Sequence, residues 1–199
     1  MRYWFDTEFI EAGAEAPIHL LSIGIVSEDG RTYYAQLHHK DFPKAGDWVA
    51  CNVFPFLEHF DMGRQERSCI AQKRENHPNN ASCIDKACPW KWRDDLRDDL
   101  RLFFDPEKYG KPEIWGYYAD YDWVVLCQLF GTMMDLPKGW PMYCRDIKQW
   151  CDALGNPKLP PEGKDEHHAL ADARWNRQAW EFLSTYKPVC PCGNDGCSH

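Results

Sequence analysis

The chain has 199 residues, 44% of them hydrophobic and 27% charged, and its formal net charge is −8 with neutral histidines. A chain of this length and composition can bury a substantial core as one domain with attachments, which excludes a fully disordered protein. The acidic balance also excludes a protein that coats nucleic acid by bulk charge. An enzyme whose carboxylates hold cations remains compatible with it.

The apolar pattern disfavours both export and membrane insertion. The longest apolar stretch, Leu20 to Val26, is far shorter than the roughly 20 residues that span a bilayer. The opening MRYWFDTEF has no signal-peptide pattern. We therefore expect a cytoplasmic protein without a membrane partner, and its ten cysteines are expected to be thiols or metal ligands.

The first 37 residues predict a three-stranded antiparallel meander. In residues 2–10 hydrophobic and polar positions alternate, so that Asp6 and Glu8 share one face of a strand with Trp4. Residues 20–26 alternate in the same way. The Asp29-Gly30 pair then predicts a turn into a third strand.

The remainder of the chain predicts an α/β domain with an insertion. Residues 41–95 contain four prolines and no sustained period, so we expect irregular structure there and a polar surface insertion at about 61–92. Beyond it, short strands and helices alternate, which is typical of α/β folds. The expected helices are 94–104, 121–130, 146–154 and 168–186, and the expected strands are 113–118 and 142–145.

Asp6 and Glu8 are the first candidate site residues. Like charges that lie side by side repel in a buried setting unless a cation lies between them. The flanking Trp4, Phe5 and Phe9 favour burial of this strand. The pair therefore indicates a metal site, with a solvated strand face as the alternative.

Asp122 is the second candidate, because it lies on the apolar stripe of its predicted helix. It is three, four and seven residues before Val125, Leu126 and Leu129. Burial of an unpaired aspartate is costly, so this side chain needs a partner. The alternative is a role as the helix N-cap. Asp120 lies off the stripe and is the weaker candidate.

Asp172 and His167 are the third pair of candidates. Asp172 borders the buried face of the last predicted helix. His167 is about 140° away from it on an ideal helix, so both can address one site only if His167 lies in the approach to the helix. The loop upstream, rich in proline and glycine, permits this. His168 is the alternative histidine.

Three segments in order resemble the motifs of the DEDDh 3′-to-5′ exonucleases: FDTEF at 5–9, YADYDW at 118–123 and HHALADAR at 167–174. The resemblance covers about 1–60 and 95–186 and is greatest to the bacterial ribonuclease AS type of exoribonuclease. It implies a ribonuclease H-like α/β fold with a central mixed sheet of five strands flanked by helices.

The resemblance also implies a reaction. In that family the positions matching Asp6, Glu8, Asp122 and Asp172 hold two Mg²⁺ or Mn²⁺ ions, and the position matching His167 deprotonates the attacking water. The implied substrate is the 3′ end of single-stranded RNA, adenylate-rich in that branch, and the implied assembly is a homodimer. Two alternatives stay open: an exonuclease for single-stranded DNA, and a non-catalytic nucleic-acid-binding module on the same fold.

The cysteines suggest zinc as a second metal. We expect an exonuclease domain at 1–187 and a cysteine-rich tail at 188–199. In the tail, a zinc knuckle and a metal-free segment are both compatible with the uncommon spacing of four candidate ligands, Cys190, Cys192, Cys197 and His199. A looser candidate set in the insertion is Cys69, His77, Cys83 and Cys88. The expected buried thiols are Cys51, Cys127, Cys144 and Cys151.

Overall fold

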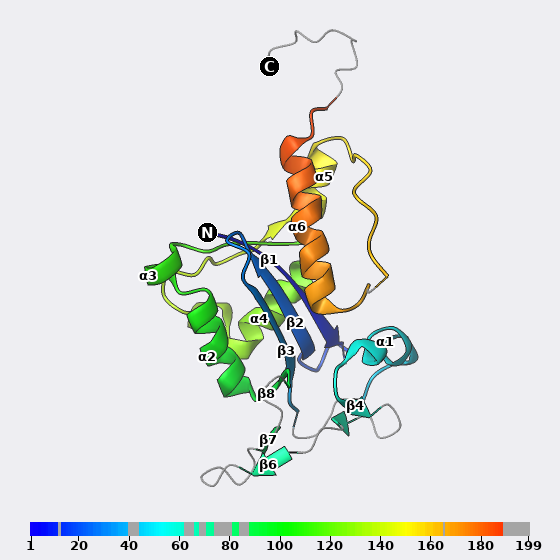
Figure 1. The fold of residues 1–199 in the computed structure, drawn as a ribbon, viewed down its shortest axis with the longest axis vertical. Coiled ribbons are helices and arrows are strands. Elements are labelled where there is room, and N and C mark those ends of the chain that lie inside the picture. The colour runs from blue at the N-terminus through cyan, green and yellow to red at the C-terminus, as the bar shows by residue number, and fades with distance from the viewer. Residues whose placement is uncertain are drawn as a thin grey trace.

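A six-stranded mixed sheet forms the centre of the structure (Figure 1). The computed structural model describes residues 1–188 except 12, 40–43, 62–65, 68–70, 74–80, 84–87 and 165. The strands of the sheet are β1 (Arg2–Ile10), β2 (His19–Ser27), β3 (Thr32–Leu37), β8 (Trp90–Lys91), β9 (Glu113–Gly116) and β10 (Arg145–Asp146). Their order is β10-β9-β1-β2-β3-β8. β2 pairs antiparallel with β1 and β3, and the other three pairings are parallel.

The expected α/β class and the three-stranded meander are confirmed, whereas the expected number of five strands is wrong. The additional strand, β8, pairs Trp90 and Lys91 with Gln36 and Leu37. A strand of two residues is too short to show an alternating pattern, so its pairing is decided by the neighbouring strand and not by its own sequence.

Helices cover both faces of the sheet (Figure 1). One face is covered by α6 (Ala169–Thr185) and α5 (Ile147–Ala153), and the other by α2 (Arg93–Phe103) and α4 (Asp120–Phe130). The other described elements are α1 (Asp47–Asn52), η1 (Phe54–Phe56), β4 (Phe60–Asp61), β5 (Glu66–Arg67), β6 (Ala71–Lys73), β7 (Ala81–Cys83), α3 (Pro106–Tyr109) and η2 (Met133–Asp135). Within the described residues no helix has the length and apolar composition to span a bilayer.

The alternation expected in β1 divides the core between the two helical layers. Tyr3 and Phe5 pack in one cluster with residues of α2 and α4, such as Leu100. Trp4 packs in another cluster with α5 and α6. Asp6 and Glu8 follow Trp4 at intervals of two, so they belong to the α6 side of the sheet.

α6 is attached directly to the backbone of β1. The side-chain amide of Asn176 donates to the carbonyl oxygen of Phe5 over 2.9 Å, and Asn176 is 1% exposed. The contact joins the middle of α6 to the strand that carries Asp6 and Glu8. It thereby holds the helix of Asp172 against that strand.

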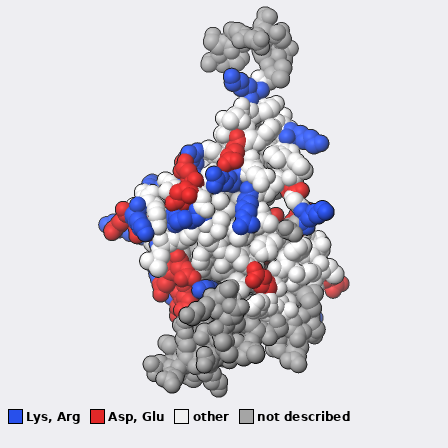
Figure 2. All heavy atoms as spheres, in the orientation of Figure 1, with Lys and Arg blue, Asp and Glu red and all other residues white. Residues whose placement is uncertain are grey.

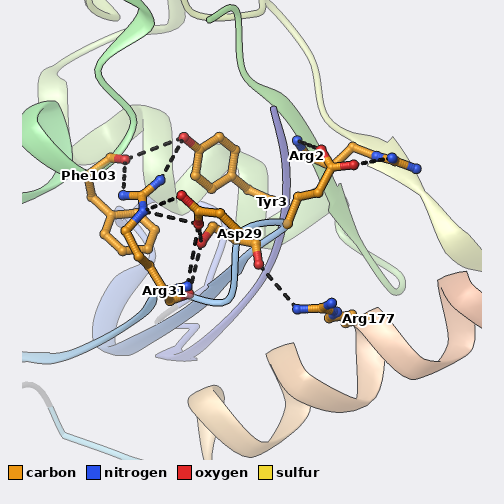
Figure 3. A network of polar contacts seen from close by, with 8 residues as sticks. Arg2, Tyr3, Asp29, Arg31, Phe103 and Arg177 are labelled. Atoms are coloured by element: carbon orange, nitrogen blue, oxygen red, sulfur yellow. Dashed lines mark hydrogen bonds and ion pairs between the residues drawn. The ribbon is translucent and has the colours of Figure 1, made fainter. Parts of the chain in front are cut away.

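Two arginines, Arg31 and Arg177, attach the ends of β2 and β3 to helices on either side of the sheet. At the turn between β2 and β3, Arg31 pairs with Asp29 over 2.9 Å and donates to the carbonyl of Phe103 over 3.0 Å (Figure 3). Arg177 of α6 donates to the carbonyl of Ser27 over 3.3 Å. In Figure 2, the lysine and arginine side chains of the face with α6 are interspersed with aspartate and glutamate. These arginines therefore contribute to packing of the strand turn rather than to a continuous basic surface.

Candidate active site

The C-terminal half of β1 meets a helix where a strand would otherwise continue the sheet. β9 pairs with β1 only from Arg2 to Trp4. Beyond that point the backbone N–H of Thr7 donates to Oδ1 of Asp122 over 2.8 Å, and the Thr7 hydroxyl donates to the same oxygen over 2.6 Å. The first turn of α4 therefore brings Asp122 to the edge of β1, between the positions of Asp6 and Glu8.

Asp122 is buried, as its place on the apolar stripe predicted. It is 7% exposed. The alternative role as N-cap is wrong, because Ala119 is the N-cap of α4 and Asp122 lies inside the first turn. Asp120, the weaker candidate, is exposed.

His167 and Asp172 meet because the helix begins after the histidine. His168 is the N-cap of α6, so His167 lies in the approach to the helix, as the sequence required. The N–H of His167 donates to Oδ2 of Asp172 over 2.8 Å. The φ of His167 is +72°, a left-handed conformation that is uncommon outside glycine. This backbone turn directs His167 back toward the first turn of α6.

The candidate residues from β1 and α6 form one cluster. Glu8, His167 and Asp172 each offer one ligand atom, and these atoms lie within 4.8 Å of one another. Asp6 precedes Glu8 by two residues on the same face of β1, and Asp122 is bonded to Thr7 between them, so both lie beside this group of three but are not part of it. The structure thus brings Glu8 of β1 together with His167 and Asp172 at the start of α6, more than 150 residues further along the chain.

The surroundings of the two carboxyl groups of β1 disfavour their ionised forms. Burial, followed by repulsion from Asp172 and Asp122, raises the pKa of Glu8 to about 9. Burial also raises the pKa of Asp6 well above its ordinary range, and repulsion from neighbouring carboxylates adds to the effect.

The pKa values of Asp122 in α4 and Asp172 in α6 are raised as well. Burial raises the pKa of Asp172 to about 7, although the hydrogen bond from the N–H of His167 lowers it. Burial raises the pKa of Asp122 to about 6 against the hydrogen bonds from Thr7. Full ionisation of all four groups near neutral pH thus requires added positive charge. A set of carboxylate oxygens suits hard divalent cations such as Mg²⁺ and Mn²⁺.

Exposed aromatic rings flank this cluster on two sides. The ring of Trp48 in α1 lies edge-on to the ring of His167, with centroids 5.0 Å apart, and Trp48 is 59% exposed. On the α4 side, Tyr121 is 50% exposed and stacks on Phe9, with centroids 6.0 Å apart. Exposed rings beside a polar site offer stacking surfaces for nucleobases.

Two residues that contact the candidate site residues, Thr7 and Trp48, were not predicted from the sequence. Thr7 alternates with Asp6 and Glu8 along the strand and therefore faces the opposite side of the sheet, and its bonds to Asp122 depend on a helix 115 residues away. Trp48 lies in a segment expected to be irregular. A tryptophan next to an acidic residue at the start of a short helix carries no pattern that would reveal its contact with His167.

The cysteine predictions have mixed outcomes. The tail set Cys190, Cys192, Cys197 and His199 lies outside the described residues, as do Cys69, His77 and the side chain of Cys83. Cys88 is buried. Among the expected buried thiols, Cys127 and Cys151 are buried and Cys144 is intermediate, but Cys51 is exposed. The prediction for Cys51 was wrong because it lies on the outer side of α1, whose hydrophobic packing uses Val49 and Ala50.

An α/β sheet that gathers clustered carboxylates and a histidine is typical of nucleases that depend on divalent metals. Comparison with known families agrees with this class. The chain belongs to the family of the 3′-5′ exoribonuclease Rv2179c-like domain, whose model matches residues 1–184. It is therefore a 3′-5′ exoribonuclease, and membership of this nuclease family implies dependence on a metal.

Two relatives are similar over nearly the whole chain. One is named 3′-5′ exoribonuclease Rv2179c and comes from Mycobacterium tuberculosis strain ATCC 25618 / H37Rv. The other is named 3′-5′ exoribonuclease MT2234.1 and comes from Mycobacterium tuberculosis strain CDC 1551 / Oshkosh. Each is 38% identical over 185 residues, which is 93% of this chain and 94% of the relative. The exoribonuclease family expected from the three motifs is thereby confirmed.

Proposed function

We propose that Asp6, Glu8, Asp122 and Asp172 hold two divalent cations, Mg²⁺ or Mn²⁺, and that His167 is the general base for hydrolysis at the 3′ end of single-stranded RNA. The observation that carries the proposal is the cluster of Glu8, His167 and Asp172, whose ligand atoms lie within 4.8 Å of one another. The products would be nucleoside 5′-monophosphates, released one at a time.

The chemistry of the side chains supports two cations. Burial raises the pKa of all four carboxyl groups, and repulsion from neighbouring carboxylates adds to the effect, so bound cations would favour their ionised forms. Bound cations would supply positive charge that aligns the phosphate, favours deprotonation of the attacking water and stabilises the leaving oxygen. Thr7 would hold the Asp122 carboxylate in place through its two hydrogen bonds.

His167 has the properties expected of the base. A nitrogen of a neutral imidazole ring can accept the proton of an attacking water molecule. Its side chain is 31% exposed, so water and substrate can reach the ring. His168 is less suitable, because its ring stacks on Tyr34 with centroids 4.5 Å apart.

The aromatic rings beside the cluster support binding of a single strand. Trp48 on one side and Tyr121 with Phe9 on the other would stack on bases near the 3′ end, an interaction that tolerates different base sequences. The strand order, with only β2 antiparallel, supports the ribonuclease H-like fold. Preference for adenylate-rich RNA, a homodimer and zinc in the tail remain predictions from the resemblance and the cysteine spacing.

Digestion of defined oligonucleotides tests the proposal. Single-stranded RNA labelled at its 5′ end should shorten stepwise from the 3′ end when Mg²⁺ or Mn²⁺ is added, with nucleoside 5′-monophosphates as products. A chelator should stop the reaction. Single-stranded DNA of the same sequence should be shortened more slowly, because only RNA offers the 2′-hydroxyl. Faster digestion of DNA would favour the DNA exonuclease, and retention of RNA without shortening would favour a binding module.

Asp6→Ala tests the site itself. The variant should lose at least a thousandfold in turnover while it keeps the circular dichroism spectrum of the wild type. Asp120→Ala is the control, since it removes an exposed aspartate at the start of α4 that lies outside the cluster. Retained activity in purified Asp6→Ala would rule this site out.

A further inference from the structure

One row of residues crosses the sheet beneath the start of α6. Asp6 of β1 lies opposite Gly24 of β2, and Gly24 lies opposite Tyr34 of β3. Residues directly opposite each other in antiparallel strands point to the same side of the sheet. The three positions therefore face α6, the helix that carries Asp172.

Gly24 is the point of closest approach between the sheet and α6. A Cβ atom at this position would lie 2.3 Å from the carbonyl carbon and oxygen of Ala169 and 2.3 Å from the nitrogen of Leu170. All three are backbone atoms of the first turn, so no side-chain rotation relieves the contact. Even the methyl group of alanine would require β2 and the first turn of α6 to move apart by about 1 Å, from 2.3 Å to the 3.4 Å at which ordinary contacts begin.

Tyr34 supports the same turn from the neighbouring strand. Its ring stacks on the ring of His168, with centroids 4.5 Å apart and planes 23° apart. His168 is the N-cap of α6 and makes no side-chain capping hydrogen bond. Its side chain therefore serves as a packing contact, which orients the backbone from which His167 turns toward Asp172.

We propose that Gly24 and Tyr34 are positioning residues, which set the distance between the two carboxylates of β1 and the pair formed by His167 and Asp172. Asp172 lies one turn beyond Ala169, and His167 precedes His168, so both follow any movement of this turn. The inference rests on the proposed metal site. Displacement of a reacting group by about 1 Å can reduce a rate about 100-fold.

Gly24→Ala tests the inference through cation binding without RNA. Mn²⁺ binding, measured by electron paramagnetic resonance, should weaken at least tenfold. The turnover number should fall at least 100-fold, whereas KM for RNA should change less than threefold, since the aromatic rings beside the site are unaltered. A folded Gly24→Ala variant with wild-type Mn²⁺ affinity and turnover would overturn the proposal.

Three further variants separate positioning from general stability. Leu183→Ala removes a buried side chain near the far end of α6, so it should lower the melting temperature without changing Mn²⁺ affinity. Tyr34→Leu should weaken Mn²⁺ binding, and Tyr34→Phe should restore it because the ring is kept. If Gly24→Ala does not fold, the Tyr34 pair decides: equal Mn²⁺ affinity in both variants would overturn the inference.

The same measurements distinguish failure of this inference from failure of the proposed function. If Asp6→Ala loses Mn²⁺ binding and turnover while Gly24→Ala and Tyr34→Leu keep both, only the positioning role is wrong. If Asp6→Ala keeps both properties, the metal site itself is wrong, and the positioning role fails with it.

Discussion

The two adjacent histidines differ in their contacts. His167 lies beside Glu8 and Asp172, whereas the ring of His168 packs on Tyr34. His167→Ala should therefore lower the turnover number by about 100-fold or more, the range for loss of a general base, with Mn²⁺ affinity retained within a few-fold. Steady-state kinetics and metal titration check this result.

His168→Phe is the control for that prediction. Phenylalanine keeps an aromatic ring against Tyr34 but cannot accept a proton, so turnover should remain within about threefold of the wild type. A large loss in His168→Phe together with an active His167→Ala variant would show that the roles of the two histidines are reversed.

Thr7 offers a second test at the scale of a single residue. Thr7→Val removes the hydroxyl that donates to Asp122 but leaves the backbone N–H bond. The Mg²⁺ concentration for half-maximal activity should rise by about 10- to 100-fold, as for other residues that orient a metal ligand. Thr7→Ser should restore the wild-type requirement. An unchanged requirement in Thr7→Val would contradict this role.

At the scale of an element, the attachment of α6 to β1 gives a prediction about stability. Asn176→Ala leaves the buried carbonyl of Phe5 without its donor, which should cost about 1–3 kcal/mol in the free energy of unfolding. Urea denaturation measures the change. Gln178→Ala, an exposed position of the same helix, should change stability by less than about 0.5 kcal/mol. Equal changes in the free energy of unfolding of the two variants would contradict the role of Asn176 in attaching α6 to β1.

The long elements agreed with prediction because their residues repeat with a clear period. The helices expected at 121–130 and 168–186 are Asp120–Phe130 and Ala169–Thr185, and the first strand is Arg2–Ile10 as expected. The two-residue strands β8 and β10 have no period of their own. Their positions depend on the strand beside them, so local pattern could not locate the sixth strand.

At the scale of the whole molecule, the raised pKa values predict how stability depends on pH. The folded protein keeps protons on Glu8 and Asp172, with pKa values of about 9 and 7, that the unfolded chain releases near its ordinary carboxyl pKa. Stability therefore decreases as pH rises from about 5 to 9. Melting temperatures of metal-free protein over this range should fall.

Added Mg²⁺ and a substitution provide the controls for this pH dependence. Mg²⁺ should reduce the decrease, since cations replace the protons that the carboxyl groups lose. Glu8→Gln should also flatten the profile, whereas Asp120→Asn, on an exposed side chain, should leave it unchanged. A metal-free wild type that is equally stable at pH 5 and pH 9 would contradict the predicted electrostatics.

The sequence by itself determined which side chains belong together on each element, because strand and helix periods of 2 and about 3.6 residues are local properties of the chain. Its patterns predict that Asp6 and Glu8 share a face of one strand, that Asp122 points into the core and that His167 precedes the last helix. The motifs in their order also identified the exoribonuclease family.

Only the tertiary structure decided which elements touch and at what distance. The bonds of Thr7 to Asp122, the contact of Trp48 with His167 and the approach of Gly24 to Ala169 all join residues more than 100 positions apart. Such contacts depend on how helices pack on the sheet, and no local period encodes that packing. The geometry of the proposed cation site therefore arises from packing, although the candidate residues for the site are recognisable in the sequence.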